Sequence, residues 1–216
     1  MDANKIIAGQ PDTRDRLLNT AQRLFAEQGF KATSLRQITH EAEANVASVN
    51  YHFGSKEEML NELIRRRVEP VNERRYTLLE KYRDEAAGQP IPLEKIFEAF
   101  FLPFFQSVAP YTDKDTMDLI HIIERLSEQS TQRQAVYEEH FKQLSITILE
   151  ALSETLPELE TTELHWRFHF ALSLMLSSMS TRQRVGNSSK GFCDPEDIEG
   201  MVKRLIQFIC AGFRAN

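Results

Sequence analysis

The segment from Ser34 to Leu60 constrains this chain most, because it contains the start signals of three consecutive helices. Ser34, with Gln37 three residues later, forms a capping box, in which a hydroxyl and an amide satisfy free backbone N–H groups at a helix start. Asn45 is a suitable N-cap for a second short helix, and another capping box begins at Ser55. Two short helices joined by a tight turn predict a helix-turn-helix, whose second helix fits the major groove of DNA.

Helical signals continue through the rest of the chain, while strand-like alternation is nearly absent. A first helix is expected from residue 12 or 13 to 28, ending before Gly29, and the helix that starts near residue 55 is expected to reach about 83 unless Pro70 ends or kinks it. Asp194-Pro195 is a strong helix start, and residues 86–92 and 186–191 are expected as a linker and a polar loop. The other predicted helices cover residues 93–108, 113–129, 132–156, 162–184 and 195–213.

These signals predict an all-α fold with an N-terminal three-helix helix-turn-helix DNA-binding domain and a larger C-terminal helical domain. The expected divisions are residues 1–54 for the first domain, 55–85 for a connecting helix and 86–216 for the second domain.

The net charge of −6 is distributed unevenly along the chain. Residues 1–68 hold ten Lys+Arg and nine Asp+Glu, a net charge of +1, so the remainder carries the entire negative excess, with a net charge of −7. Phosphate binding requires local cations rather than a basic protein overall, and Arg14, Arg16, Lys31, Arg36 and Lys56 are candidates for that role. Because no membrane span or secretory leader is recognisable, a cytoplasmic location is expected.

The second short helix offers a set of candidate base contacts. If Ala44, Val49 and Phe53 face inward, the remaining side chains of this helix point toward the groove. Apolar side chains there pack on thymine methyl groups, and hydroxyl or amide groups bond base edges. The candidates are Val46, Ala47, Ser48, Asn50 and Tyr51.

The stretch LLNTAQRLFAEQGFKATSLRQITHEAEANVASVNYHFGSKEEMLNELI resembles the DNA-binding domain of TetR-family transcriptional regulators. The resemblance implies that Arg36 reaches bases from the preceding helix. It implies phosphate contacts, which fix the register of the protein on DNA, for Ser34, Tyr51, His52 and Lys56. An ordinary packing role is the alternative for Tyr51 and His52.

Two residues depart from the family pattern. Glu43 stands at a turn position where the family usually has glycine, and a positive φ there would add backbone strain of about 1 kcal/mol. Asn50 replaces a common aromatic residue. Both departures are expected to affect which operator is read.

The resemblance also implies that residues 86–216 form a ligand-binding and dimerisation domain. The homodimer would form through the last two helices, here residues 164–184 and 198–213, and would bind a palindromic operator. The apolar content of these helices exceeds what one core-facing stripe needs. A buried dimer face explains this excess.

Residues 97–105 contain five phenylalanines, with Pro103 expected to break their helix. A broken aromatic-rich helix suits the wall of a ligand pocket, although composition alone favours a well-filled core. The patches ELHWRFHFALSLM and LIQFICAGFRAN resemble the fatty-acid-responsive PsrA-type subgroup, which implies a long-chain fatty acid or acyl effector. His121 and Arg125 are the first candidates for the anchor of an anionic head, and Arg167 with His169 the second. The alternative for each of them is an outward salt bridge. The expected ligand-binding residues are Phe100, Phe101, Phe104, Phe105, His121, Arg125, Trp166, His169 and Phe170.

Three alternatives compete with a fatty-acid sensor. The first is a regulator of the same family that senses another hydrophobic molecule. The second is a regulator of that family that senses a cationic drug, which would need acidic anchors such as Glu98 or Glu124. A helical metal-dependent enzyme or carrier would use His165 and His169, four residues apart on one helix. No nucleophile–base pair, phosphate-binding loop or third metal ligand is recognisable, so we expect neither enzymatic activity nor a bound cofactor or metal.

Overall fold

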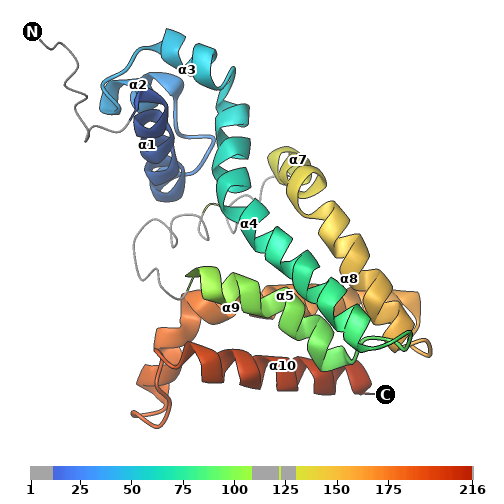
Figure 1. Cartoon of the computed structure of the whole chain (residues 1–216). Coiled ribbons are helices and arrows are strands. Elements are labelled where there is room, and N and C mark those ends of the chain that lie inside the picture. The colour runs from blue at the N-terminus through green and yellow to red at the C-terminus, as the bar shows by residue number, and fades with distance from the viewer. Residues whose placement is uncertain (1–11, 109–121, 123–129, 216) are drawn as a thin grey trace, which may run out of the picture. The chain divides into compact units, whose positions relative to one another are not determined.

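A computed structural model describes residues 12–108, residue 122 and residues 130–215, and its elements are all helices (Figure 1). The all-α fold class is therefore confirmed. The helices are α1 (Thr13–Gln28), α2 (Leu35–Glu41), α3 (Val46–His52), α4 (Lys56–Glu85), α5 (Leu93–Val108), α7 (Ser130–His140), α8 (Lys142–Thr155), α9 (Thr161–Ser188) and α10 (Ile198–Arg214). Within the described ranges, no helix has the length and apolarity needed to span a membrane.

The described chain divides into two compact units. The first contains the residues up to Arg66 and the part of α7 up to Val136, and the second contains the remainder from Arg67. Helix α4 therefore contributes to both units. The predicted boundaries at residues 54 and 85 stay a prediction.

The first unit has one core, to which each of its four N-terminal helices contributes. Gly29, with φ +85°, ends α1, and its N–H donates to the Phe25 carbonyl at 3.0 Å. The predicted first helix and its end are confirmed. The buried core side chains include Leu17, Leu18, Leu24, Phe25, Ile38, Val49, Met59, Leu60, Leu63 and Ile64.

The predicted helix starts in this unit are present, but each capping box is only half formed. The hydroxyl of Ser34 accepts from the Gln37 N–H at 3.1 Å, and that of Ser55 accepts from the Glu58 N–H at 3.0 Å. The Gln37 amide does not return to Ser34 and instead donates to Glu41 at 3.2 Å. The hydroxyl alone therefore caps α2.

In the second unit, α10 packs on α5 and α9, and α8 packs on the same two helices (Figure 1). Predicted helix 93–108 is confirmed as α5. The expectation that Pro103 breaks it is wrong, because α5 continues through this buried proline. Pro70 likewise lies inside α4.

Two further expectations on helix limits are wrong. The single helix predicted for residues 132–156 is divided at Phe141, which has non-helical dihedrals, φ −125° and ψ −22°. Asn72 donates to the His140 carbonyl at 2.9 Å, so a carbonyl at the break is satisfied by another helix. The last helix begins at Ile198 rather than Pro195, because Asp197, not Asp194, accepts the capping N–H from Gly200 at 2.8 Å.

Helix α9 also extends to Ser188, into the polar loop expected at residues 186–191. The helix predicted for residues 113–129 lies outside the described residues, except for Ile122.

Candidate nucleic-acid interface

Helix α3 presents one buried residue and an exposed outer face. Val49 is fully buried, whereas Val46 is 40% exposed and Tyr51 is 84% exposed. Ala47 and Asn50 are also exposed. An exposed face with two apolar groups, an amide and a phenol has the chemistry that base edges and phosphates require.

The start of α3 is fixed by Asn45, as expected. Its side-chain oxygen accepts from the Ser48 N–H at 2.8 Å and from the Ser48 hydroxyl at 3.1 Å. Ser48, predicted as a base contact, therefore has its hydroxyl engaged within the helix end. Its role at a base stays a prediction, as does that of Ser34, whose hydroxyl caps α2.

The turn between α2 and α3 contains Glu43 at φ +50°. This is the left-handed region, which costs an L-residue about 1–2 kcal/mol. The Ala44 N–H donates to the Thr39 carbonyl at 2.8 Å, and the Arg16 guanidinium donates to the Ala42 carbonyl at 3.3 Å. The turn is thus held from α1 and α2 despite its strained residue.

Replacing Glu43 by glycine is expected to raise the free energy of unfolding by about 1 kcal/mol, because glycine adopts positive φ without strain. Urea unfolding measures this change. Glu43→Ala is the matched control, since it removes the same charge but keeps a Cβ at positive φ, and it should leave the stability nearly unchanged. An equal gain in both variants would assign the effect to charge rather than to the backbone.

Two predicted cations of the reading region differ in their surroundings. Arg36 is exposed on α2, and no partner of its guanidinium appears among the described residues. Lys56 instead donates to the Phe30 and Thr33 carbonyls, both at 2.9 Å, and lies 4.2 Å from the Phe30 ring centre. Lys56 thus holds the loop before α2, and its contact with a phosphate stays a prediction.

The end of α3 is aromatic. The rings of Tyr51 and His52 meet edge to face at 5.0 Å, and Arg14 lies over the Phe53 ring at 5.2 Å. His52 is half-buried, so a packing role is present for it. The hydroxyl of Tyr51 lies at the exposed end of its side chain.

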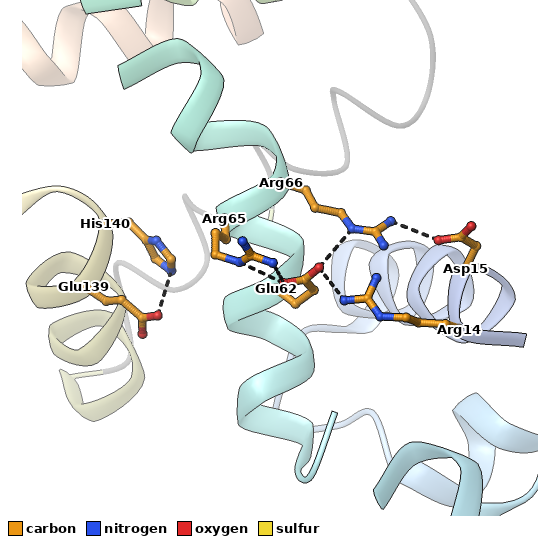
Figure 2. Close-up of polar contacts among 7 residues, drawn as sticks. All are labelled: Arg14, Asp15, Glu62, Arg65, Arg66, Glu139 and His140. Carbon is orange, nitrogen blue, oxygen red and sulfur yellow. Dashed lines mark hydrogen bonds and ion pairs between the residues drawn. The ribbon is translucent and has the colours of Figure 1, made fainter. Parts of the chain in front are cut away.

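Figure 2 shows three arginines around Glu62 at the start of α4. Arg14 donates to Glu62 at 2.6 Å and Arg66 at 3.1 Å, while Arg65 makes a closer contact. Arg66 also donates to Asp15 at 3.1 Å. Burial raises the pKa of Glu62, but the hydrogen bonds from the three guanidinium groups outweigh it and hold the pKa at about 2. This network fastens the start of α4 to α1 inside the first unit.

The predicted ligand residues of α5 lie in a packed aromatic core. Phe100, Phe101 and Phe105 are buried, and Phe104 is half-buried. Their rings contact one another in series: the centres of Phe100 and Phe101 are 5.5 Å apart with the rings tilted, and those of Phe104 and Phe105 are 5.2 Å apart with the rings edge to face. Phe168 of α9 meets Phe100 at 5.7 Å.

The predicted ligand residues of α9 lie elsewhere, on its outer face. Trp166 is 56% exposed and Phe170 is 55% exposed. Thr162, His165, Trp166 and His169 line an open depression of about 440 Å³. The structure therefore does not join the α9 residues to the α5 phenylalanines in one site, and His121 and Arg125 lie outside the described residues.

The second candidate anchor, Arg167, has another task. Its guanidinium donates to the carbonyls of Gly212, Phe213 and Ala215 at 2.8–3.1 Å. These carbonyls lie at the end of α10, where the helix itself provides no N–H donors for them. In the described part of the chain, no three potential metal ligands lie together, and the pair His165 and His169 of the metal-site alternative lies on the wall of the α9 depression.

Sequence reasoning missed Arg75, which is only 3% exposed. It lies on α4 between Val71 and Leu79, four residues from each, and both are buried. This i, i+4 spacing places a guanidinium on the apolar stripe of the helix, which is the signal that could have identified it. Its neighbour Arg74 is exposed.

A short capped helix that exposes its outer face, preceded by a tight turn on a three-helix core, defines a helix-turn-helix protein of the DNA-binding class, here with a separate helical body. Comparison with known families agrees. Residues 17–63 match "Bacterial regulatory proteins, tetR family", and residues 98–212, more than half of the chain, match "Tetracyclin repressor-like, C-terminal domain". The chain belongs to the TetR family.

Individual relatives are regulators too. The HTH-type transcriptional repressor KstR2 of Mycobacterium tuberculosis H37Rv is 35% identical over 103 residues, 47% of this chain and 48% of that protein. The HTH-type transcriptional regulator LmrA of Bacillus subtilis is 36% identical over 78 residues, 36% of this chain and 42% of that protein. The chain thus matches about half the length of these curated relatives or less.

Solved structures show the same fold at low identity. A putative tetR family transcription regulator from Shewanella sp. PV-4 superposes with a TM-score of 0.61 at 17% identity, covering 94% of this chain and 96% of that one. The structure of Mycobacterium smegmatis AmtR superposes with a TM-score of 0.59 at 17% identity, covering 99% of this chain and 92% of that one. Because the two matched family models describe transcriptional regulators, the expectation that the chain is not an enzyme is confirmed.

Proposed function

We propose that this protein is a transcriptional repressor that binds a palindromic DNA operator as a homodimer and releases it when a small hydrophobic effector binds. The observation that carries the DNA-binding part is the exposed outer face of α3 around the buried Val49. The name of KstR2, a transcriptional repressor, supports repression rather than activation.

The homodimer is proposed to form through the outer faces of α9 and α10. On α10, Met201, Leu205 and Phe208 follow one another at spacings of four and three residues, and Phe208 is 68% exposed. Gly212 continues this stripe, and a Cβ built there meets no atom within 4 Å. Packing within the chain therefore does not require a glycine at this position. Because glycine has no side chain, it would let a helix of the second protomer approach α10 closely.

Selection from a random duplex library tests the DNA-binding proposal. The full chain should enrich sequences with two inverted half-sites whose centres are about 34–36 Å apart, or a multiple of that spacing, and fluorescence anisotropy should show them bound at least ~10³-fold more tightly than random duplex. Failure to enrich any sequence would contradict the proposal.

A long-chain fatty acid or acyl derivative is proposed as the effector, supported by the resemblance of the α9 and α10 sequences to the fatty-acid-responsive PsrA-type subgroup and by the apolar, phenylalanine-rich character of α5. Another hydrophobic molecule is the second candidate. A cationic drug has less support, because Glu98 already accepts from the Tyr82 hydroxyl at 2.6 Å and from Lys95 at 2.8 Å.

A further inference from the structure

Arg75 is a buried cation in the second unit, held mainly by weak or neutral acceptors. Its Nε donates to the Phe100 carbonyl at 2.8 Å, and Nη1 donates to the Asn72 side-chain oxygen at 3.0 Å. Nη2 faces the Met175 sulfur at 3.8 Å. The guanidinium carbon lies 4.5 Å from the centre of the Phe100 ring.

Among the described residues, no acidic side chain balances the charge of Arg75. No carboxylate of the described residues pairs with it, in contrast to Arg14, Arg23, Arg65 and Arg66 of the first unit. Burying an ion without a partner opposes folding strongly, and burial accordingly lowers the pKa of Arg75 to about 9. A protein gains from such a group only if the group does something that an apolar side chain cannot do.

The contact with Phe100 accounts for part of this role. Pro103 lacks an N–H, so the turn of α5 before it loses a helical hydrogen bond. Arg75 donates to the carbonyl three residues before that proline. The carbonyl that loses its helical donor to Pro103 is that of Ala99, so the bond to Phe100 joins α4 to α5 beside the proline without replacing the missing bond. It uses one of the five N–H donors of the guanidinium.

The Nη2 side of Arg75 remains poorly satisfied. A thioether sulfur is a weak acceptor, and at 3.8 Å it gives a cation little compensation. Methionine is also the most adaptable apolar side chain, with three rotatable bonds. Met175 can therefore swing aside, and an anionic oxygen would then form charge-assisted bonds that sulfur cannot provide.

We propose that Arg75 is the anchor for the anionic head of an amphiphilic effector, which displaces the Met175 sulfur and bonds the Nη groups as a carboxylate or phosphate. This inference rests on the proposed function, because it names the chemistry of the effector of that regulator. Buried Phe100 and half-buried Phe104 provide apolar contacts for the remainder of the ligand. Arg75 lies on α4, the helix whose start is fastened to α1, so binding acts on a helix shared with the DNA-reading unit.

Isothermal titration calorimetry on the full chain tests the proposal with three probes of matched tail: decanoate, decyl phosphate and decanamide. A charge-assisted hydrogen bond predicts that at least one of the two anions binds about tenfold or more tightly than neutral decanamide. Whichever anion is preferred identifies the head group. If the wild-type protein binds all three probes with equal affinity, that result alone would overturn the proposal.

Variants then assign the preference to Arg75. Arg75→Met should remove the preference for the anions and leave decanamide binding within about threefold, whereas Arg74→Met, on the exposed neighbour, should leave the preference intact. Retention of the preference in a folded Arg75→Met would overturn the proposal, as would its loss in Arg74→Met. Because no DNA is present in this experiment, its outcome is independent of the operator selection that tests the proposed function.

Discussion

Phe208→Glu is expected to convert the proposed homodimer into a monomer. Two-fold symmetry places every substitution in the interface twice, so the variant would remove two exposed phenylalanine side chains and introduce two carboxylates. Burying a phenylalanine contributes about 1.5–3 kcal/mol, and the loss at two sites weakens association by about 10²–10⁴-fold before charge repulsion is added. Sedimentation velocity across a concentration series measures the change in the dimer dissociation constant.

Gln207→Glu is the matched control, because it introduces the same carboxylate one residue earlier, on the side of α10 that also carries Arg204. This variant should remain dimeric. Far-ultraviolet circular dichroism checks that Phe208→Glu keeps its helical content, as expected for a side chain that is 68% exposed. A folded Phe208→Glu that sediments as a dimer would place the interface elsewhere.

In the first unit, the sequence predicts several helix ends at the correct residue, because the signals that set them are local. Gly29 at the end of α1 and Asn45 at the start of α3 act within four residues of their partners. The outward position of Asn50 and the burial of Val49 follow from helical period alone. The strain at Glu43 was predicted in another way, from the resemblance to a family that usually has glycine at this turn position.

The errors in the second unit arise where a distant residue decides a local structure. Pro103 does not end α5, and Arg75 of α4 donates to the α5 backbone beside it. The break between α7 and α8 is satisfied by Asn72, 68 residues before His140 in the chain. Local propensity contains no information on such partners.

The same reason limits prediction of the candidate site. Lys56 was expected at a phosphate and Arg167 at an effector, yet each donates to backbone carbonyls that are 23 to 48 residues away. A cation on a helix surface gives no sequence signal that separates these roles. Arg36 is different, because the described structure leaves its guanidinium exposed, as base reading requires.

Arg36→Ala is therefore expected to weaken binding to the selected operator by about 10–100-fold, which corresponds to the 1–3 kcal/mol of a bidentate base contact. Binding to random duplex should fall much less, so the loss is one of specificity. Fluorescence anisotropy with the selected duplex, its single-base variants and random duplex measures both affinities, and discrimination should relax at one position in each half-site.

Arg36→Lys separates a base contact from a phosphate contact. Lysine keeps the charge but lacks the planar fork that bonds two acceptors of a guanine at once. If Arg36 reads a base, the lysine variant should keep the salt dependence of the wild type while losing most of the discrimination at that position. If Arg36 instead binds a phosphate, the lysine variant should behave as wild type, and the alanine variant should bind all duplexes more weakly with a salt slope reduced by about one. That second pattern would move sequence reading onto α3 alone, to Val46, Ala47, Asn50 and Tyr51.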